Sequence, residues 1–318
     1  MSHLTRTGTE LSATGADRLG FGVPGYAHPL VAPVEWAELT RPGTPLHWVV
    51  LNVADGPGAR PDPHCLEAAG RLRNAGVRVL GHLDLRHGTR PGAELLADAA
   101  RFAEWYRVAG YYLDRCPTDR TGLPAVRRTA TALVEPGGTD GCHLVLGHGS
   151  HPWPGYAELP GQLVTFSGPW ADYRWSQAAP WTADHPPERF AHLVHGVPRG
   201  HLEEAMRIAR WQGAGTIFFT DRTAHRTPPP ADGIAGPGGT GRAGRSAGIA
   251  EITGITGIAG IIRATGNSSG GRPGGGTVSS AESCPENWPE STSHNSPFEA
   301  LPGYWDEIVS RIGPGISE

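Results

Sequence analysis

Residues 78-RVLGHLD-84 and 111-YYLD-114 decide the fold, because each is a short apolar run that ends on an aspartate, with a helix-length segment between them. Six more runs of this form end on a polar side chain or a glycine. Eight such runs, separated by helix-length segments, predict a closed (β/α)₈ TIM barrel of α/β class. The other six are 22-GVPGYAH-28, 48-WVVLN-52, 143-HLVLGH-148, 163-LVTFS-167, 192-HLVH-195 and 216-TIFFTD-221.

The segments between these runs have helical periodicity and end on glycines. Apolar residues recur at the 3.6-residue period over residues 62–74, and Gly76 follows as a stop. The segments 93-AELLADAARFAEWYRVAG-110 and 201-HLEEAMRIARWQGAG-215 repeat this form. Such junctions are typical of the αβ turns of a parallel β/α architecture. Weaker helices are predicted at residues 124–133 and around 185–191.

Composition divides the chain into a predicted barrel, a polar N-terminal segment and a long segment rich in Gly, Ser and Pro. Residues 1–18 are polar and predict a flexible leader. Residues 224–296 are rich in Gly, Ser and Pro, which predicts a low-complexity, disordered insertion. An apolar helical pattern returns in 297-PFEALPGYWDEIVSRIG-313 and predicts a last helix that docks on the barrel. The predicted barrel therefore comprises residues 19–223 and 297–318.

Charge and composition exclude several classes of partner. The formal net charge of −4 and the dispersed arginines argue against nucleic acid. No run of 18 apolar residues or apolar signal segment occurs, so we expect a cytoplasmic protein with no membrane contact. No glycine-rich phosphate loop follows a strand, so no cofactor is expected. The cysteines lack CxxC or metal-ligand spacing, which predicts free thiols and no metal: Cys65, Cys116, Cys142 and Cys284.

The polar strand ends predict a single site, because barrel active sites lie at the carboxyl ends of the strands. Asp114 is the predicted central acid, and Asp84 or Asp221 is a candidate second carboxylate. Asp84–Arg86 or Asp114–Arg115 salt bridges are an equally good interpretation of these charges. The predicted substrate-binding residues are Tyr26, His28, Asn52, His82, Arg115, His148, Ser167, Trp170 and His195.

Histidines and aromatic residues crowd the predicted loops at the mouth. A cluster of His and Asp can bind a metal, but these histidines come from different loops without HxH or HExxH spacing, so ordinary hydrogen bonding is favoured. Aromatic rings can stack on sugar faces, which favours a saccharide-like small molecule or glycan as partner. We expect about half of these aromatic residues to pack in the core or in loops instead. The residues are Tyr26, Trp153, Tyr156, Trp170, Tyr173, Trp175 and Trp181.

Several phrases resemble the spherulin-4-like, or spherulation-specific family 4, proteins. They are VPGYAHP (23–29), LNVADGPG (51–58), VLGHLDLRHGTR (79–90), WYRVAGYYLDRCP (105–117), LVTFSGPWADYRW (163–175) and LPGYWDEI (301–308). The resemblance implies a barrel related to glycoside hydrolase family 135, whose studied members cleave galactosamine-containing exopolysaccharide. It also implies an Asp-Glu pair after strand 4 and a glutamate ending strand 6. Asp114 matches the aspartate, whereas Arg115 and Ser167 occupy the glutamate positions.

Three functions follow as hypotheses. The first is a carbohydrate-active, glycoside hydrolase-like barrel that acts on or binds an amino-sugar-containing glycan, with Asp114 as the central acid. The second is a catalytically inactive barrel that binds a glycan or a protein, which Arg115 and Ser167 favour. The third is a hydrolase that uses Ser167 with His148 or His195. It is the weakest of the three, because Phe-Ser-Gly-Pro lacks the GxSxG elbow.

Overall fold

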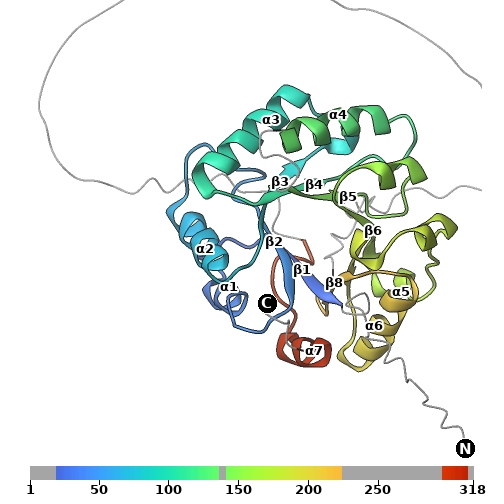
Figure 1. Cartoon of the computed structure of the whole chain (residues 1–318). Coiled ribbons are helices and arrows are strands. Elements are labelled where there is room, and N and C mark those ends of the chain that lie inside the picture. The colour runs from blue at the N-terminus through green and yellow to red at the C-terminus, as the bar shows by residue number, and fades with distance from the viewer. Residues whose placement is uncertain (1–18, 136–140, 224–295, 314–318) are drawn as a thin grey trace, which may run out of the picture. The chain divides into compact units, whose positions relative to one another are not determined.

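The computed structural model describes residues 19–135, 141–223 and 296–313. Eight parallel strands close into a barrel in the order β1 to β8, so the predicted (β/α)₈ fold is confirmed. Helices surround the strands (Figure 1). The strands are β1 (Gly20–Gly25), β2 (Leu46–Leu51), β3 (Val79–Asp84), β4 (Gly110–Asp114), β5 (His143–Gly147), β6 (Gln162–Pro169), β7 (Phe190–His195) and β8 (Thr216–Thr220).

The helices are unequal in length around the ring. Asp62 caps α2, and its side chain accepts hydrogen bonds from the backbone N–H groups of His64 and Cys65. The α3 helix continues into a π-helical turn over Phe102–Tyr106, and Arg107 ends it in the left-handed region. The helices are α1 (Pro33–Glu38), α2 (Pro63–Asn74), α3 (Gly92–Arg101), α4 (Leu123–Val134), α5 (Trp170–Tyr173), α6 (Leu202–Trp211) and α7 (Trp305–Ile312).

The side of the barrel between β6 and β7 differs from the sequence prediction. The sequence predicts a helix around residues 185–191, but only a short 3₁₀ turn, Pro187–Arg189, forms there before β7 begins at Phe190. Pro186 and Pro187 explain the difference, because proline lacks the backbone N–H that a continuing helix needs. The α5 helix, with four residues, covers this side together with further 3₁₀ turns.

The barrel interior is filled by aromatic and polar side chains. Trp48 on β2 packs against Tyr112 on β4 with ring centroids 5.9 Å apart. The Trp48 indole N–H donates to Gln162 Oε1 at 2.8 Å, and the Gln162 amide donates to Thr216 Oγ1 at 2.8 Å. These bonds satisfy buried polar groups across β2, β6 and β8 below the mouth.

The α7 helix packs on the outside of β1. Trp305 lies 4.8 Å from Phe21 between ring centroids, and Ile308 is fully buried. Just before α7, the Gly303 N–H donates to Asp221 at the end of β8. Among the described residues, no helix is both long and apolar enough to cross a membrane. The predicted leader, residues 1–18, and residues 224–295 of the predicted insertion lie outside the described residues.

Candidate functional site

Two aspartates lie side by side where β3 and β4 end. Asp84 and Asp114 are register partners, as are His82 and Tyr112 two residues earlier on the same strands. Because side chains alternate along a strand, all four lie on one face of the sheet. Adjacent strands are roughly 4.8 Å apart, so these side chains form one cluster at the barrel mouth.

Arg115 binds Asp84 rather than its sequence neighbour Asp114. Its Nε donates to Asp84 Oδ1 at 2.8 Å and its Nη2 donates to Oδ2. Arg115 has a φ of 48°, a left-handed backbone that is uncommon outside glycine. The Arg86 guanidinium, the partner expected for Asp84, stays 4.0 Å away. The salt bridge at this site therefore joins the two strand ends instead of closing a single loop.

This ion pair keeps Asp84 ionised. Burial acts to raise the pKa of Asp84, but the hydrogen bonds from the Arg115 side chain and the Arg86 backbone, with the Arg115 charge, lower it below its ordinary value. An ionised carboxylate that is already bound by a guanidinium cannot donate a proton near neutral pH. Asp84 is consequently a poor candidate for a general acid.

Asp114 contacts His82 and, within the described residues, forms no ion pair with an arginine. Its Oδ2 lies 3.2 Å from His82 Nε2, and its Oδ1 accepts the Arg115 backbone N–H at 2.9 Å. The Asp114 side chain is one-third exposed, whereas His82 is buried beneath it. Asp114 is thus the carboxylate at this end of the mouth that a ligand can reach.

Tyr26 lies next to this pair at the end of β1. Its ring meets His82 edge-on with centroids 5.5 Å apart. Burial raises the pKa of Tyr26 well above its ordinary value, and the charges of Asp114 and Asp84 add to the effect, so the hydroxyl keeps its proton. Asn52, half-buried at the end of β2, accepts the Gly56 N–H at 3.0 Å and keeps its amide donors.

The β6–β8 side of the mouth carries three more of the predicted residues. Ser167 is exposed, and within the described chain its hydroxyl forms no hydrogen bond with a histidine. His195 packs against Phe298, and burial lowers its pKa. The Gly196 N–H next to it donates to the Arg222 backbone carbonyl oxygen at 2.7 Å. Asp221 is exposed and binds the Gly303 backbone, so it holds the C-terminal segment in place.

Two predicted residues are used in packing behind the mouth. His148 donates from Nδ1 to the Pro117 carbonyl at 2.8 Å and packs on Tyr156, and burial lowers its pKa to about 4. This neutral imidazole supports the β4–α4 loop. Trp170 is buried, with Arg174 stacked over its ring. Tyr156 is likewise fully buried, as expected for part of the aromatic set.

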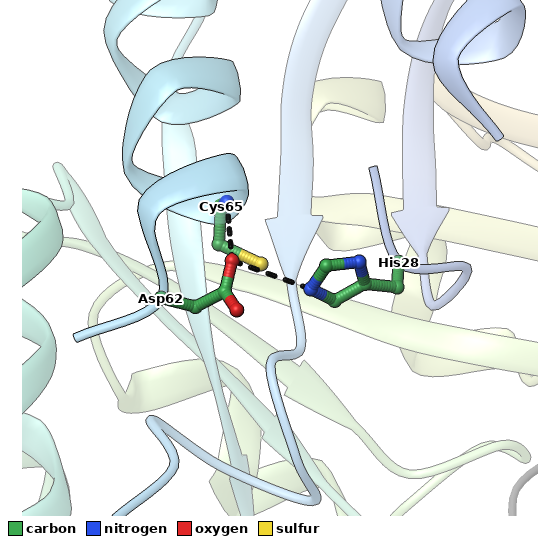
Figure 2. A group of neighbouring side chains, drawn as sticks. All are labelled: His28, Asp62 and Cys65. Atoms are coloured by element: carbon green, nitrogen blue, oxygen red, sulfur yellow. Dashed lines mark hydrogen bonds and ion pairs between the residues drawn. The ribbon is translucent and has the colours of Figure 1, made fainter. Parts of the chain in front are cut away.

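His28 belongs to a group that the sequence did not reveal. Figure 2 shows its imidazole pointing at Asp62, with the Cys65 sulfur beside the same carboxylate. The His28 Nε2 and Asp62 Oδ1 atoms are 3.3 Å apart, and the Cys65 side chain is fully buried. Only the capping aspartate ahead of residues 63–74 had a sequence signal, because His28 lies in another loop.

Surface hollows occur elsewhere on the barrel. One of about 510 Å³ lies along α4, lined by Leu123, Arg127 and Arg128, and one of about 420 Å³ lies between α3 and α4. Neither is lined by Asp84, Asp114 or Tyr26. We place the candidate site at the mouth, because convergent polar groups at strand ends define barrel sites better than hollow size does.

The strands form a closed (β/α)₈ barrel, and two aspartates at strand ends lie at its candidate site. The model of spherulation-specific family 4 matches residues 21–231, and the chain belongs to this family. Spherulin-4 of Physarum polycephalum is 21% identical over 228 residues, which cover 69% of this chain and 68% of that protein. The crystal structure of Aspergillus clavatus Sph3 in complex with GalNAc matches with a TM-score of 0.55 at 22% identity, covering 64% of this chain and 90% of that one.

Proposed function

We propose that this barrel binds an amino-sugar-containing glycan at the mouth formed by Tyr26, Asn52, His82, Asp84 and Asp114. Family membership and the likeness to Sph3, which was crystallised with GalNAc, support a saccharide ligand. The groups at the mouth suit one chemically. The Asp114 carboxylate can accept from hydroxyl, amide or ammonium groups, and the Tyr26 hydroxyl can donate to a sugar oxygen.

The Arg115–Asp84 ion pair carries the second part of the proposal, that hydrolysis is weak or absent. Glycosidases generally use two carboxyl groups, one of which must donate a proton. Asp84 is bound by Arg115 and Asp221 by the Gly303 backbone, so neither is poised for that role. By resemblance, Arg115 and Ser167 stand where related hydrolases have glutamates.

Binding and turnover measured separately test this function. We expect GalNAc and galactosamine oligomers to bind the wild type in a calorimetric titration, with reducing-end release at or near background. Tyr26→Phe and Asp114→Asn should each weaken binding roughly tenfold, consistent with the loss of one hydrogen bond of about 1.4 kcal/mol. Unchanged affinity in both variants would place the ligand elsewhere.

Hydrolysis through Asp114 is a second candidate, favoured by its contact with His82 at 3.2 Å. On this alternative, the wild type turns over galactosamine oligomers at an ordinary rate on the order of 1–10³ s⁻¹. On the binding proposal, by contrast, the double variant Arg115→Glu, Ser167→Glu should create or raise hydrolysis. If the wild type hydrolyses the oligomers faster than the double variant does, the result would favour hydrolysis through Asp114.

A further inference from the structure

The loop after β1 and the first turn of α2 with its cap bring a histidine, an aspartate and a cysteine together at the rim of the barrel (Figure 2). We propose that His28, Asp62 and Cys65 bind a divalent transition-metal ion of the zinc type. This site is separate from the carboxylates at the centre of the mouth. It replaces the expectation from the sequence that the chain holds no metal.

The donor set matches the chemistry of zinc. Imidazole nitrogen, thiolate sulfur and carboxylate oxygen are the three ligand types that Zn²⁺ takes in proteins. The thiolate argues against magnesium and calcium, which prefer oxygen alone. With Cys65 deprotonated and Asp62 ionised, the two negative charges would balance one divalent cation.

The geometry already approximates a coordination sphere. One ligand atom from each residue lies within 4.8 Å of the other two. The distance of 3.3 Å between His28 Nε2 and Asp62 Oδ1 agrees with two ligands on a tetrahedral zinc ion, which are about 3.4 Å apart at bond lengths near 2.1 Å. Sidechain movements of about an ångström therefore complete the site.

The atoms that would bind the metal contact one another or the first turn of α2. The His28 Nε2 atom is buried, and its contact in the described structure is with Asp62 Oδ1 at 3.3 Å, a residue of the proposed site itself. The Asp62 Oδ1 atom that faces His28 also caps α2, where it accepts from the His64 and Cys65 backbones, and no hydrogen bond to the second Asp62 oxygen is found in the described structure. A capping carboxylate can thus serve both the helix and the cation.

Two local contacts must change when the ion binds, because the metal takes the place of the Nε2 proton that faces Asp62 and the bond at Nδ1 is lost. The His28 Nδ1 atom accepts the Leu30 N–H at 3.2 Å, whereas a metal-bound neutral imidazole carries its proton on that nitrogen. Leu30 is exposed, so its N–H can turn to water, at the cost of one surface hydrogen bond. That cost is small compared with the free energy of zinc binding to proteins.

The fourth position has a local candidate. His64 is exposed, and its ring centroid lies 6.0 Å from that of His28. Either His64 or a water molecule can complete the tetrahedron. The occupied site would fasten the β1–α1 loop, which follows Tyr26, to the first turn of α2, so we assign it a structural role at the rim.

Cobalt substitution tests the site directly. The full chain is treated with chelator and titrated with Co²⁺, and a near-ultraviolet charge-transfer band at one ion per chain is expected to report a cobalt–thiolate bond. Zn²⁺ should displace Co²⁺ and raise the melting temperature. Cys65→Ala should abolish the band, whereas Cys142→Ala, which removes a thiol on another part of the barrel, should keep it.

A further variant distinguishes loss of a metal ligand from loss of the fold. Asp62→Asn preserves the cap, because asparagine is as good a capping residue as aspartate, but removes the anionic ligand. We expect Asp62→Asn and His28→Ala each to weaken Zn²⁺ binding about 100-fold or more, since loss of outer-shell partners alone costs 10–100-fold. A Co²⁺ complex without a thiolate band, or Zn²⁺ affinity unchanged in these two variants, would overturn the proposal.

Discussion

Replacing Arg115 with glutamine tests whether its guanidinium stabilises the barrel through Asp84. Arg115 has a φ of 48°, and glutamine meets the same left-handed strain as arginine. Glycine would relieve that strain and hide the loss of the ion pair. The variant therefore isolates the two hydrogen bonds that the Arg115 side chain donates to Asp84.

The exposure of Asp84 and Arg115 determines how much stability the Arg115→Gln variant should lose. The Asp84 side chain is 15% exposed and that of Arg115 is 50% exposed. Exposed ion pairs contribute about 0.2–1 kcal/mol, whereas a buried charged group that loses its partner costs about 1–3 kcal/mol or more. Water and the Arg86 N–H still reach Asp84, so we expect a loss of about 1–2 kcal/mol at pH 7. For a domain of this size, the melting temperature should fall by about 2–8 °C.

The loss should depend on pH in a defined direction. The pKa of Asp84 in the folded protein lies below its ordinary value, because Arg115 and the Arg86 N–H outweigh the effect of burial. Such a carboxylate stabilises the fold above its unfolded pKa, about 3.9, and the contribution disappears as the pH falls through the folded pKa. The difference between wild type and variant should therefore be full at pH 7 and shrink below about pH 4.

Thermal unfolding followed by tryptophan fluorescence at pH 7 and at pH 3 measures both effects. Arg86→Gln is the matched control, because Arg86 also has a φ of 48° but its Nε lies 4.0 Å from Asp84. We expect less than about 0.5 kcal/mol from the control, as is usual for an exposed side chain. Equal losses in both variants, or a loss at pH 3 as large as that at pH 7, would refute the reasoning.

Three further predictions concern the site, the last helix and the long connection. Asp114→Asn should abolish any turnover of galactosamine oligomers. Because the Asp114 side chain is one-third exposed, the melting temperature should shift by less than about 4 °C, the effect of 1 kcal/mol. Turnover that survives this substitution would show that another residue is the acid. Trp305→Ala should cost about 3 kcal/mol or more in urea unfolding, since its buried ring packs on Phe21, and a loss below 1 kcal/mol argues against docking of α7. A chain that lacks residues 224–296, with Thr223 linked to Pro297 by a short Gly/Ser linker, should melt within a few degrees of the full chain; a larger fall shows that the barrel needs the segment.

The strands and the position of the two aspartates could be predicted from the sequence. Each strand is an apolar run with a polar end, and closure of the barrel turns these ends into one mouth. Asp84 and Asp114 end neighbouring strands and are register partners, which the order of the runs implies. These features depend on local pattern and on the regular geometry of parallel strands.

The partner of Arg115 could not be predicted, because it depends on a backbone angle. Adjacency in the sequence suggested the Asp114–Arg115 and Asp84–Arg86 pairs. The left-handed conformation at Arg115 accompanies its bond across to β3, and nothing in a DRCP sequence requires a positive φ. The grouping of His28, Asp62 and Cys65 could not be predicted either, because it depends on how the loop after β1 approaches the start of α2.

The position of His148 follows from the alternation of side chains along β5. A Cβ added at Gly147 would lie 2.9 Å from the Tyr112 hydroxyl, so Gly147 faces the barrel interior. Since side chains alternate along a strand, the next residue, His148, lies on the opposite face. Strict counting from the interior residues of β5 places His148 behind the β4–α4 loop, where its Nδ1 bonds to Pro117.

The contacts of His195 and Gly196 have a consequence for engineering. The Gly196 N–H donates to the Arg222 backbone carbonyl, and the His195 ring packs on Phe298, so Arg222 and Phe298 lie beside the same two neighbouring residues. A segment that joins two neighbouring points of the barrel can be of any length. Each doubling of the length of a flexible segment lowers the free energy of unfolding by only about 0.6 kcal/mol. A folded domain with adjacent termini could therefore be grafted between Thr223 and Ser296, beside the barrel mouth, without disturbing the ring of strands.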